Sequence, residues 1–379
     1  MTDDERLGLL DDLIKRTLKA GADAADAIYV EGTSLSLACR LGKTEHLERS
    51  EGADLGLRAF KGKRQAVVSS SDIASHTLDE LVERVVSMAN NVPEDPHCGI
   101  AERDQLASGD YPELDLVDLG EPNTETLKER ALEAEDAARA VKGVTNTEGG
   151  EASWGRSSVA LATSNGFTGT RSGSRSGISV SVLAGEGTNM ERDYDYASAI
   201  FASDLPSPAE LGKRAGDQAV ARLNPQQPDS CEVPVLFDPR CSNTIIGHLS
   251  GAINGSSIAR GTSFLKDSMG KQLFPKNITI VDDPHRVRGL RSKEFDGEGL
   301  ATSRRNLIKN GVLKTWIMNL SSARQLGLQS TGHASRGTSA PPGSGVTNLY
   351  LEPGDLTPAE LMADIKSGLY VTEMIGMGV

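Results

Sequence analysis

The chain of 379 residues has four cysteines, and aromatic residues make up only 4% of it. Cys39, Cys98, Cys231 and Cys241 stand far apart and form no Cys-x-x-Cys pair. This spacing indicates neither a disulfide framework nor a structural zinc ribbon, so reduced thiols are expected.

Basic residues are also in the minority, with 40 Lys and Arg against 53 Asp and Glu and a net charge of -13. Binding to a phosphate backbone depends on clustered Lys and Arg, so direct nucleic-acid binding is not expected. No segment is apolar over the length needed to cross a bilayer, and the acidic, amphipathic N-terminus (1–21) lacks the features of a signal peptide. We therefore expect a cytoplasmic protein that does not bind membranes.

Helical and extended patterns alternate along the chain. Helices are predicted where apolar residues recur at helical spacing or start signals occur, at 7–18, 78–89, 124–141, 207–223 and 357–368. Strands are predicted at 35–41, 55–59, 65–69, 158–164, 167–170, 178–182, 232–237 and 278–281. Asn165-Gly166 and Asn310-Gly311 are typical of two-residue hairpin turns. The mixture predicts an α+β fold with mixed, largely antiparallel sheets, interspersed helices and two to three subdomains.

The domain boundaries follow from composition and from helix signals. Residues 92–123 are rich in Pro, Asp, Glu and Gly without periodicity, which indicates a connecting segment. We expect an N-terminal α+β domain over 1–115, a middle helix and β-hairpin region over 116–228, and a C-terminal domain over 229–379. The last predicted helix begins after Thr357 and should end at Gly368 with Leu361 and Ile365 facing inward.

The stretch from Cys241 to Phe264, CSNTIIGHLSGAINGSSIARGTSF, resembles a helix of the TldD/PmbA family. In that family a TldD-type subunit carries His-Glu-x-x-x-His, a short Gly-rich segment and an Arg/Lys-Gly-Thr-Ser run. On this pattern His248 falls on the first zinc ligand, Leu249 on the catalytic Glu and Ile253 on the second His. A catalytic zinc needs three protein ligands and a carboxylate that takes a proton from the bound water, and aliphatic side chains supply neither. The family's third ligand is a cysteine nearer the C-terminus, whereas Cys241 is the last cysteine here.

These departures are typical of the PmbA branch, also called TldE, which is the non-zinc subunit. Four further segments are similar to sequences of the family: GLRAFKGKRQAVVSSSD, VLFDPR, STGHASRG and TNLYLEPG. The resemblance therefore covers essentially the whole chain. Family members usually continue for several tens of residues after a Gly-Met-Gly run, and we expect the C-terminal domain to be shortened after Gly376-Met377-Gly378-Val379.

The resemblance implies a subunit that pairs with a TldD-type zinc subunit to process or degrade unfolded peptides, as in microcin maturation and antitoxin removal. Zinc is expected in the partner, with no metal or other cofactor and no catalytic residue in this chain. Family members have also been named modulators of DNA gyrase, an effect expected to act through proteins. Strands that line a shared cavity are expected to bind an extended chain through main-chain hydrogen bonds.

Six residues are candidates for substrate binding: His248, Arg260, Gly261, Thr262, Ser263 and His333. His248 is also explained as a plain polar helix residue, and the run 260–263 as a structural turn after a helix. His333 has hydroxyl neighbours, so a nucleophile pair in a stand-alone hydrolase is an alternative. A further alternative is a homodimeric binding or regulatory protein without a peptidase role.

Overall fold

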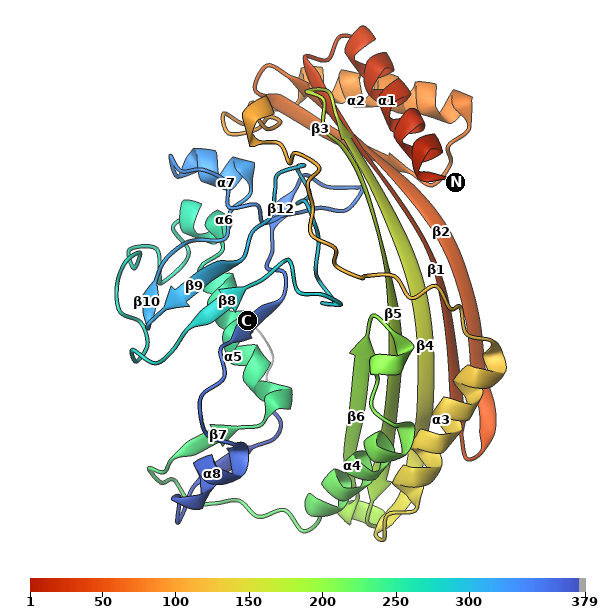
Figure 1. The fold of residues 1–379 in the computed structure, drawn as a ribbon, viewed down its shortest axis with the longest axis vertical. Helices are drawn as coiled ribbons and strands as arrows, with labels where there is room; N and C mark the ends of the chain where they lie inside the picture. The colour runs from red at the N-terminus through yellow and green to blue at the C-terminus, as the bar shows by residue number, and fades with distance from the viewer. Residues whose placement is uncertain (375–379) are drawn as a thin grey trace.

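A long, curved, six-stranded sheet forms the centre of the molecule (Figure 1). The computed structural model describes residues 1–374. Every neighbouring pair of strands in this sheet is antiparallel, and the order is β3-β2-β1-β4-β5-β6. The strands are β1 (Ala24–Arg40), β2 (Lys43–Lys61), β3 (Arg64–Ser70), β4 (Val144–Thr163), β5 (Thr168–Ala184) and β6 (Glu191–Ala199). Because β1 pairs with β4, the first two predicted domain ranges share one sheet.

Four helices cover one face of this sheet, which we call the outer face. They are α1 (Asp3–Lys19), α2 (Ser75–Asn91), α3 (Thr124–Arg139) and α4 (Pro208–Ala221). Ala27 packs in the cluster under α1 and α2, whereas Leu35 packs under α3. These two residues of β1 are an even number of positions apart, and alternate side chains point to opposite faces of a sheet. The two helix pairs therefore lie on the same face, one pair at each end of the strands.

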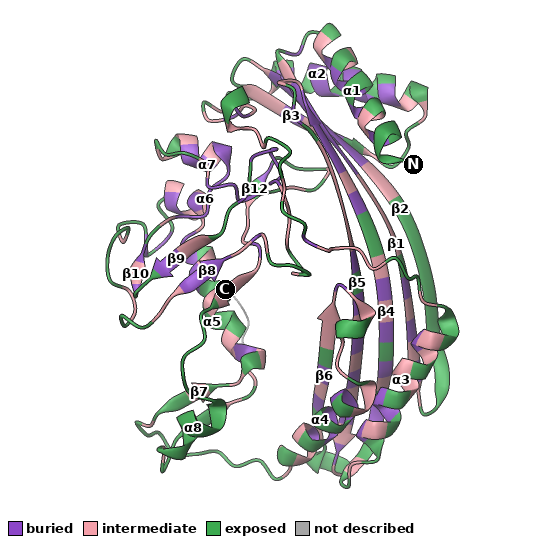
Figure 2. Cartoon of the chain, viewed as in Figure 1, coloured by how far each residue is buried: buried purple, intermediate pink, exposed green. Residues whose placement is uncertain are grey.

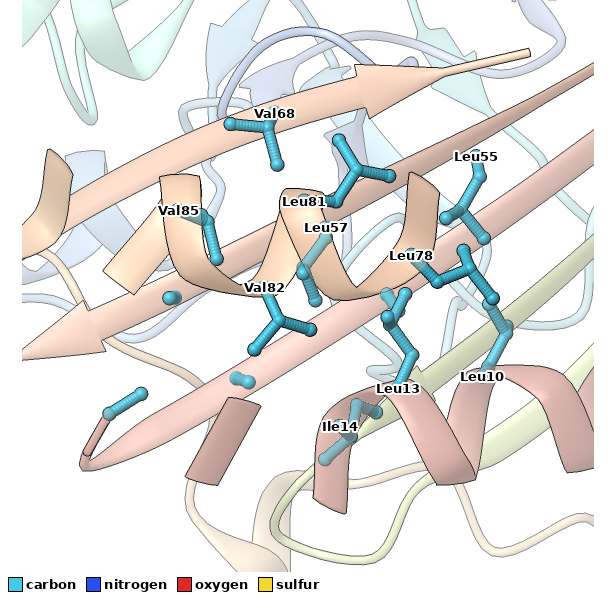
Figure 3. Close-up of a cluster of buried hydrophobic side chains, with 14 of the residues drawn as sticks. Leu10, Leu13, Ile14, Leu55, Leu57, Val68, Leu78, Leu81, Val82 and Val85 are labelled. Carbon is cyan, nitrogen blue, oxygen red and sulfur yellow. The ribbon is translucent and has the colours of Figure 1, made fainter. Parts of the chain in front are cut away.

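The cluster under α1 and α2 shows why these segments are helical (Figure 3). Leu10 and Leu13 are 0% and 1% exposed and meet Leu55 and Leu57 of β2, which are fully buried. Burying one leucine side chain contributes about 1.5–3 kcal/mol. Thr2 starts α1 with a capping box. The predicted helices at 7–18 and 78–89 are confirmed.

The C-terminal region lies on the concave side of the sheet, which we call the inner face (Figure 1). Its helices are α5 (Pro239–Ala252), α6 (Gly255–Ala259), α7 (Leu320–Gln325) and α8 (Pro358–Ala363). Its strands are β7 (Val235–Phe237), β8 (Ile280–Asp282), β9 (Arg305–Lys309), β10 (Val312–Leu313), β11 (Ala334–Ser335), β12 (Gly343–Ser344), β13 (Leu349–Leu351) and β14 (Leu369–Val371). Strands β10-β9-β8-β13 form an antiparallel sheet, and β7 pairs with β14 in parallel. Three short 3-10 helices, η1 (Arg103–Gln105), η2 (Gly187–Asn189) and η3 (Ala202–Asp204), complete the described elements.

Figure 2 shows buried residues on the strands of the main sheet and in the C-terminal region, and contacts between such residues join this region to one end of the inner face. Ile28 of β1 and Leu161 of β4 pack with Phe167 and Phe295, whose ring centroids are 5.0 Å apart. An ion-pair network lies beside them, in which Asp26 accepts hydrogen bonds from Arg58 and Arg336. Since Arg336 belongs to the C-terminal region, apolar and ionic contacts both fix it to the sheet.

The predicted α+β class with largely antiparallel sheets is confirmed. Both predicted hairpins occur, with Asn165-Gly166 between β4 and β5 and Asn310-Gly311 between β9 and β10. The strands of the main sheet are longer than predicted, and β1, β2, β4 and β5 have 17, 19, 20 and 17 residues. In β2, β4 and β5 the unpredicted parts are rich in Ser, Gly and charged residues, so they lack the apolar alternation on which the prediction depended. The unpredicted part of β1 (24–34) is different, because its apolar residues form a nearly continuous run instead of an alternation.

The prediction for the last helix is correct at its start and wrong at its end. Thr357 forms the expected capping box, but α8 ends at Ala363, before Gly368. Leu361 is 51% exposed instead of facing inward. A helix of six residues has fewer than two turns, and none of its residues is buried within the described part of the chain. The predicted shortening after Gly376 lies outside the described residues.

Candidate functional site

Helix α5 carries the residues that align with the family's zinc motif. Asp238 caps it by accepting a hydrogen bond from the Arg240 backbone N–H, and Pro239 occupies the first turn. His248 is exposed. Leu249 and Ile253 are 8% and 0% exposed and pack in the core of the C-terminal region. The apolar face of α5 therefore points inward, and His248 lies away from that core.

This donor set does not fit a zinc ion. The two side chains that take the places of the catalytic Glu and second His are aliphatic and form part of a core. Within residues 1–374, no three His, Cys, Asp or Glu residues lie close enough together to hold a metal ion. A single imidazole falls short of the three protein ligands of a catalytic zinc site.

The run Arg260 to Ser263 closes helix α6. The N–H groups of Gly261 and Thr262 donate to the carbonyls of Ile258 and Ser257 at 2.9 and 3.1 Å, which is the Schellman arrangement. Gly261 has a φ of +73°, which favours glycine. These backbone donors are therefore engaged within the chain. The Arg260 side chain is exposed and accessible to a ligand.

Ser263 ties this run to helix α5. Its hydroxyl donates to the Ala252 carbonyl at 2.5 Å, and its side chain is buried. The structure thus brings the 260–263 run to the C-terminal end of the helix that carries His248. A substrate-binding role for His248 and for these four residues stays a prediction.

His333 lies in a separate, buried network. Its Nε2 is 3.1 Å from Oδ2 of Asp282, and its Nδ1 is 2.9 Å from the hydroxyl of Thr331. All three residues are at most 6% exposed. Burial alone would raise the pKa of Asp282, but hydrogen bonds from His333 and Thr347 outweigh it and hold this pKa below its usual value. The hydroxyl partner that a nucleophile requires is present, but it is enclosed with His333 in the core.

An open site lies on the inner face of the main sheet, beyond the part covered by the C-terminal region. It is a groove of about 540 Å³. Strand pairing places mainly glycine and serine across its floor in two neighbouring rows, one of which ends in an arginine. The first row contains Gly32, Ser157 and Gly173, and the second contains Ser50, Ser34, Gly155 and Arg175. The loop between β8 and β9 forms a rim with Gly289, Leu290 and Ser292.

The chemistry of this floor follows from its residue types. Glycine inside a strand often marks a place where a ligand or another backbone approaches closely. The backbones of β1 and β4 are hydrogen-bonded to strands on both sides, so serine hydroxyls are the groups available to a ligand there. The expected main-chain binding would require an unpaired strand edge, which these central strands lack.

The sequence analysis missed these groove residues. Its predicted strands 167–170 and 178–182 leave out Arg171 to Gly177, which is rich in Gly and Ser, whereas this run is a regular part of β5. The usable signal was the placement of Gly and Ser at alternate positions, such as Gly32 and Ser34 or Gly155 and Ser157. Period-two placement of small residues indicates one face of a strand.

Comparison with known proteins agrees with this architecture. Three family models match: PmbA/TldA metallopeptidase domain 1 over residues 25–89, the central domain over 117–223 and the C-terminal domain over 230–379. The chain is 34% identical to metalloprotease PmbA of Escherichia coli O157:H7 over 94% of its own length and 78% of that protein. It therefore belongs to the PmbA/TldD metallopeptidase family, as the sequence motifs predicted.

Solved structures share the fold. TldE from Thermococcus kodakarensis superposes with a TM-score of 0.86 at 22% identity, covering 97% of this chain and 83% of that one. A candidate modulator of DNA gyrase from Bacteroides thetaiotaomicron gives a TM-score of 0.91 at 24% identity, covering 99% and 84%. Among residues 1–374, no helix combines the length and apolar character needed to cross a membrane.

Proposed function

We propose that this chain is the non-zinc subunit of a peptidase that acts on flexible polypeptides, and that a TldD-type partner supplies the zinc. The observation that carries the proposal is the orientation of α5, in which Leu249 and Ile253 are packed in a core while His248 is exposed. A relative over most of the chain bears the name metalloprotease. Catalysis by the assembly would then need ligands and a carboxylate from a second subunit.

The groove supports a peptide-handling role. A floor of glycine and serine presents hydroxyls and close backbone without a deep apolar pocket for one particular side chain. Such a surface accepts an extended chain of varied sequence, whereas a folded domain could not enter a groove of about 540 Å³. The groove would then select substrates by their flexibility more than by their sequence.

Exposed apolar residues in the C-terminal region support pairing with another subunit. They lie on β7, β14, α5 and α8, and comprise Val235, Phe237, Leu369, Ile245, Leu361 and Met362. Apolar residues gathered in this way on a surface commonly mark a protein interface. We assign this surface to the zinc-bearing partner. We also infer a cytoplasmic location, since none of the four cysteines is in a disulfide.

The test is reconstitution with the TldD-type subunit. Each subunit alone and the mixed pair should be assayed for cleavage of an unstructured peptide, and zinc should be measured in each after separation. We expect cleavage by the pair and zinc in the partner. Cleavage by this chain alone, with one zinc per chain, would refute the proposal. A persistent homodimer that ignores the partner in size-exclusion chromatography would favour the regulatory alternative.

A groove variant makes the test specific. Gly173 has room for a side chain, since a Cβ there would meet only the Leu116 carbonyl at 3.7 Å. Gly173→Val should keep the fold, with stability within about 1 kcal/mol, because valine suits a strand. It should weaken peptide cleavage by the pair by filling the floor. Gly8→Ala on α1, where a Cβ meets nothing within 4 Å, is the control and should leave cleavage unchanged.

A further inference from the structure

The groove on the inner face differs in charge from the rest of the molecule. The chain has 53 acidic residues, yet among the described residues no Asp or Glu lines this groove. Two other surface hollows on the same sheet contain carboxylates, for example Glu51 and Glu121 in one and Glu148 and Glu151 in another. The charge of the groove is therefore a local property.

Two arginines of β5 occupy one side of the groove. Arg171 and Arg175 flank Gly173 on the same face, because all three are an even number of residues apart. Four residues along a strand span about 13 Å. The two guanidinium groups are thus placed to meet two separate groups of an extended ligand.

Neither arginine has a carboxylate within 4.0 Å in the part of the chain that the structure describes. Arg175 is exposed, and its Nη2 donates to the hydroxyl of Ser198 at 3.1 Å. Arg171 donates to the Phe295 carbonyl at 3.5 Å. Burial lowers the pKa of Arg171, and the more distant Glu294 and Asp296 oppose this shift. Each guanidinium group makes one hydrogen bond to a neutral oxygen, and a carboxylate can accept two N–H groups of an arginine at once.

The rim loop adds further positive charge. Residues 286–293 read RVRGLRSK and contribute Gly289, Leu290 and Ser292 to the groove. Arg288 is paired with Asp115 and Asp204. Arg291 is exposed on the same loop. The charge of Arg288 is offset by its two carboxylate partners, and the exposed Arg291 remains as a cation on this side of the groove.

We propose that Arg171 and Arg175 bind carboxylate groups of the peptide, so that the groove prefers flexible segments with acidic residues about four positions apart. This inference rests on the proposed peptide-handling function and specifies its substrate class. A nucleic acid is a poorer fit, because the net charge of -13 repels a polyanion and the groove offers few cations for many phosphates.

The experiment measures binding of the full chain to three labelled peptides by fluorescence anisotropy. The peptides share one Gly/Ser/Gln sequence and carry Glu, Gln or Lys at two positions four residues apart. We expect the Glu peptide to bind about tenfold more tightly than the Gln peptide, which is the effect of about 1.4 kcal/mol from charge-assisted hydrogen bonds. The Lys peptide should bind least, and the preference should weaken as salt increases.

Variants assign the preference to the groove. Arg175→Gln should abolish most of the advantage of the Glu peptide, and Arg175→Lys should restore part of it by returning the charge. Arg84→Gln, on the exposed face of α2, makes the same charge change outside the groove and should have no effect. Since Arg175 is exposed, neither substitution should impair folding, which circular dichroism would verify.

Three results would overturn the inference. Equal affinity for the Glu and Gln peptides would remove the acidic preference while leaving the proposed function intact. An equal effect of Arg84→Gln and Arg175→Gln would assign the preference to the general charge of the molecule. Displacement of the Glu peptide by a single-stranded oligonucleotide of the same length would identify a phosphate site instead. Absence of binding by every peptide would contradict the proposed function itself.

Discussion

Replacing Glu298 with glutamine is expected to stabilise the protein above neutral pH and to have little effect in acid. Glu298 is 5% exposed and lies at a cavity of about 230 Å³ between the sheet and the C-terminal region. Burial and the neighbouring carboxylate of Asp296 raise the pKa of Glu298 to about 7. Arg58 and a hydrogen bond of 2.8 Å from the Leu320 N–H act in the opposite direction.

The sign and size of the effect follow from linkage. In the unfolded chain Glu298 ionises near its ordinary value of 4.5, so between 4.5 and about 7 the folded state binds more protons than the unfolded state. The free energy of unfolding therefore falls as pH rises through this window. The gap between the two pKa values corresponds to about 3 kcal/mol. Glutamine keeps an oxygen for the Leu320 N–H but carries no charge, so the variant avoids this loss.

Urea unfolding of both proteins at several pH values between 4.5 and 8.5 would check this. The variant should be about 3 kcal/mol more stable than the parent at pH 8.5 and within about 0.5 kcal/mol of it at pH 4.5. Glu83→Gln, at an exposed site on α2, is the control and should give no pH-dependent difference. A constant difference across the whole range, or a variant that is less stable at pH 8.5, would refute the assignment of a strongly raised pKa to Glu298.

Three further substitutions test buried contacts. Arg336→Ala should reduce stability by about 3–5 kcal/mol, since it removes one cation from the buried pair with Asp26, and a thermal melt unchanged within 1 °C would contradict this. His333→Ala should lower the melting temperature by breaking the contact with Asp282 without a selective loss of cleavage by the folded pair, and full stability with lost cleavage would instead favour a catalytic His333. Ile253→Ala should cost about 2–5 kcal/mol in urea unfolding because the side chain is fully buried, and a near-neutral result would show that α5 is not packed as described.

Local signals in the sequence located several turns and helix starts correctly. Asn165-Gly166 supports a hairpin through the backbone preferences of two adjacent residues, and Thr357 starts a helix through its own side chain. Such features depend on neighbours in the chain. The extent of the strands depends on pairing between distant segments, as where Ser34 meets Gly155, and this pairing was not visible as a pattern of apolar residues.

The candidate sites show the same difference between features that depend on neighbours in the chain and contacts between distant segments. The resemblance identified the helix that carries His248, and its aliphatic neighbours indicated the missing zinc ligands. The sequence did not predict that His333 would meet Asp282, because 51 residues separate them and the contact forms only when β8 and the loop after α7 pack together. The groove was missed for a related reason, since its floor combines residues from four strands.

The glycines of the inner face distinguish a packing surface from an open one. A Cβ at Gly56 would clash with the Thr338 carbonyl, so that glycine lets the C-terminal region pack against β2. A Cβ built at Gly173 would lie 3.7 Å from the nearest atom of the described structure, the Leu116 carbonyl oxygen, so packing gives no reason for a glycine there. Glycine within a strand costs roughly 0.5–1 kcal/mol relative to alanine, and Gly32 and Gly155 on the same floor add similar costs. Since a threonine or valine would stabilise the sheet at Gly173, its presence is best explained by the need for close approach of another chain, which is the role proposed for the groove.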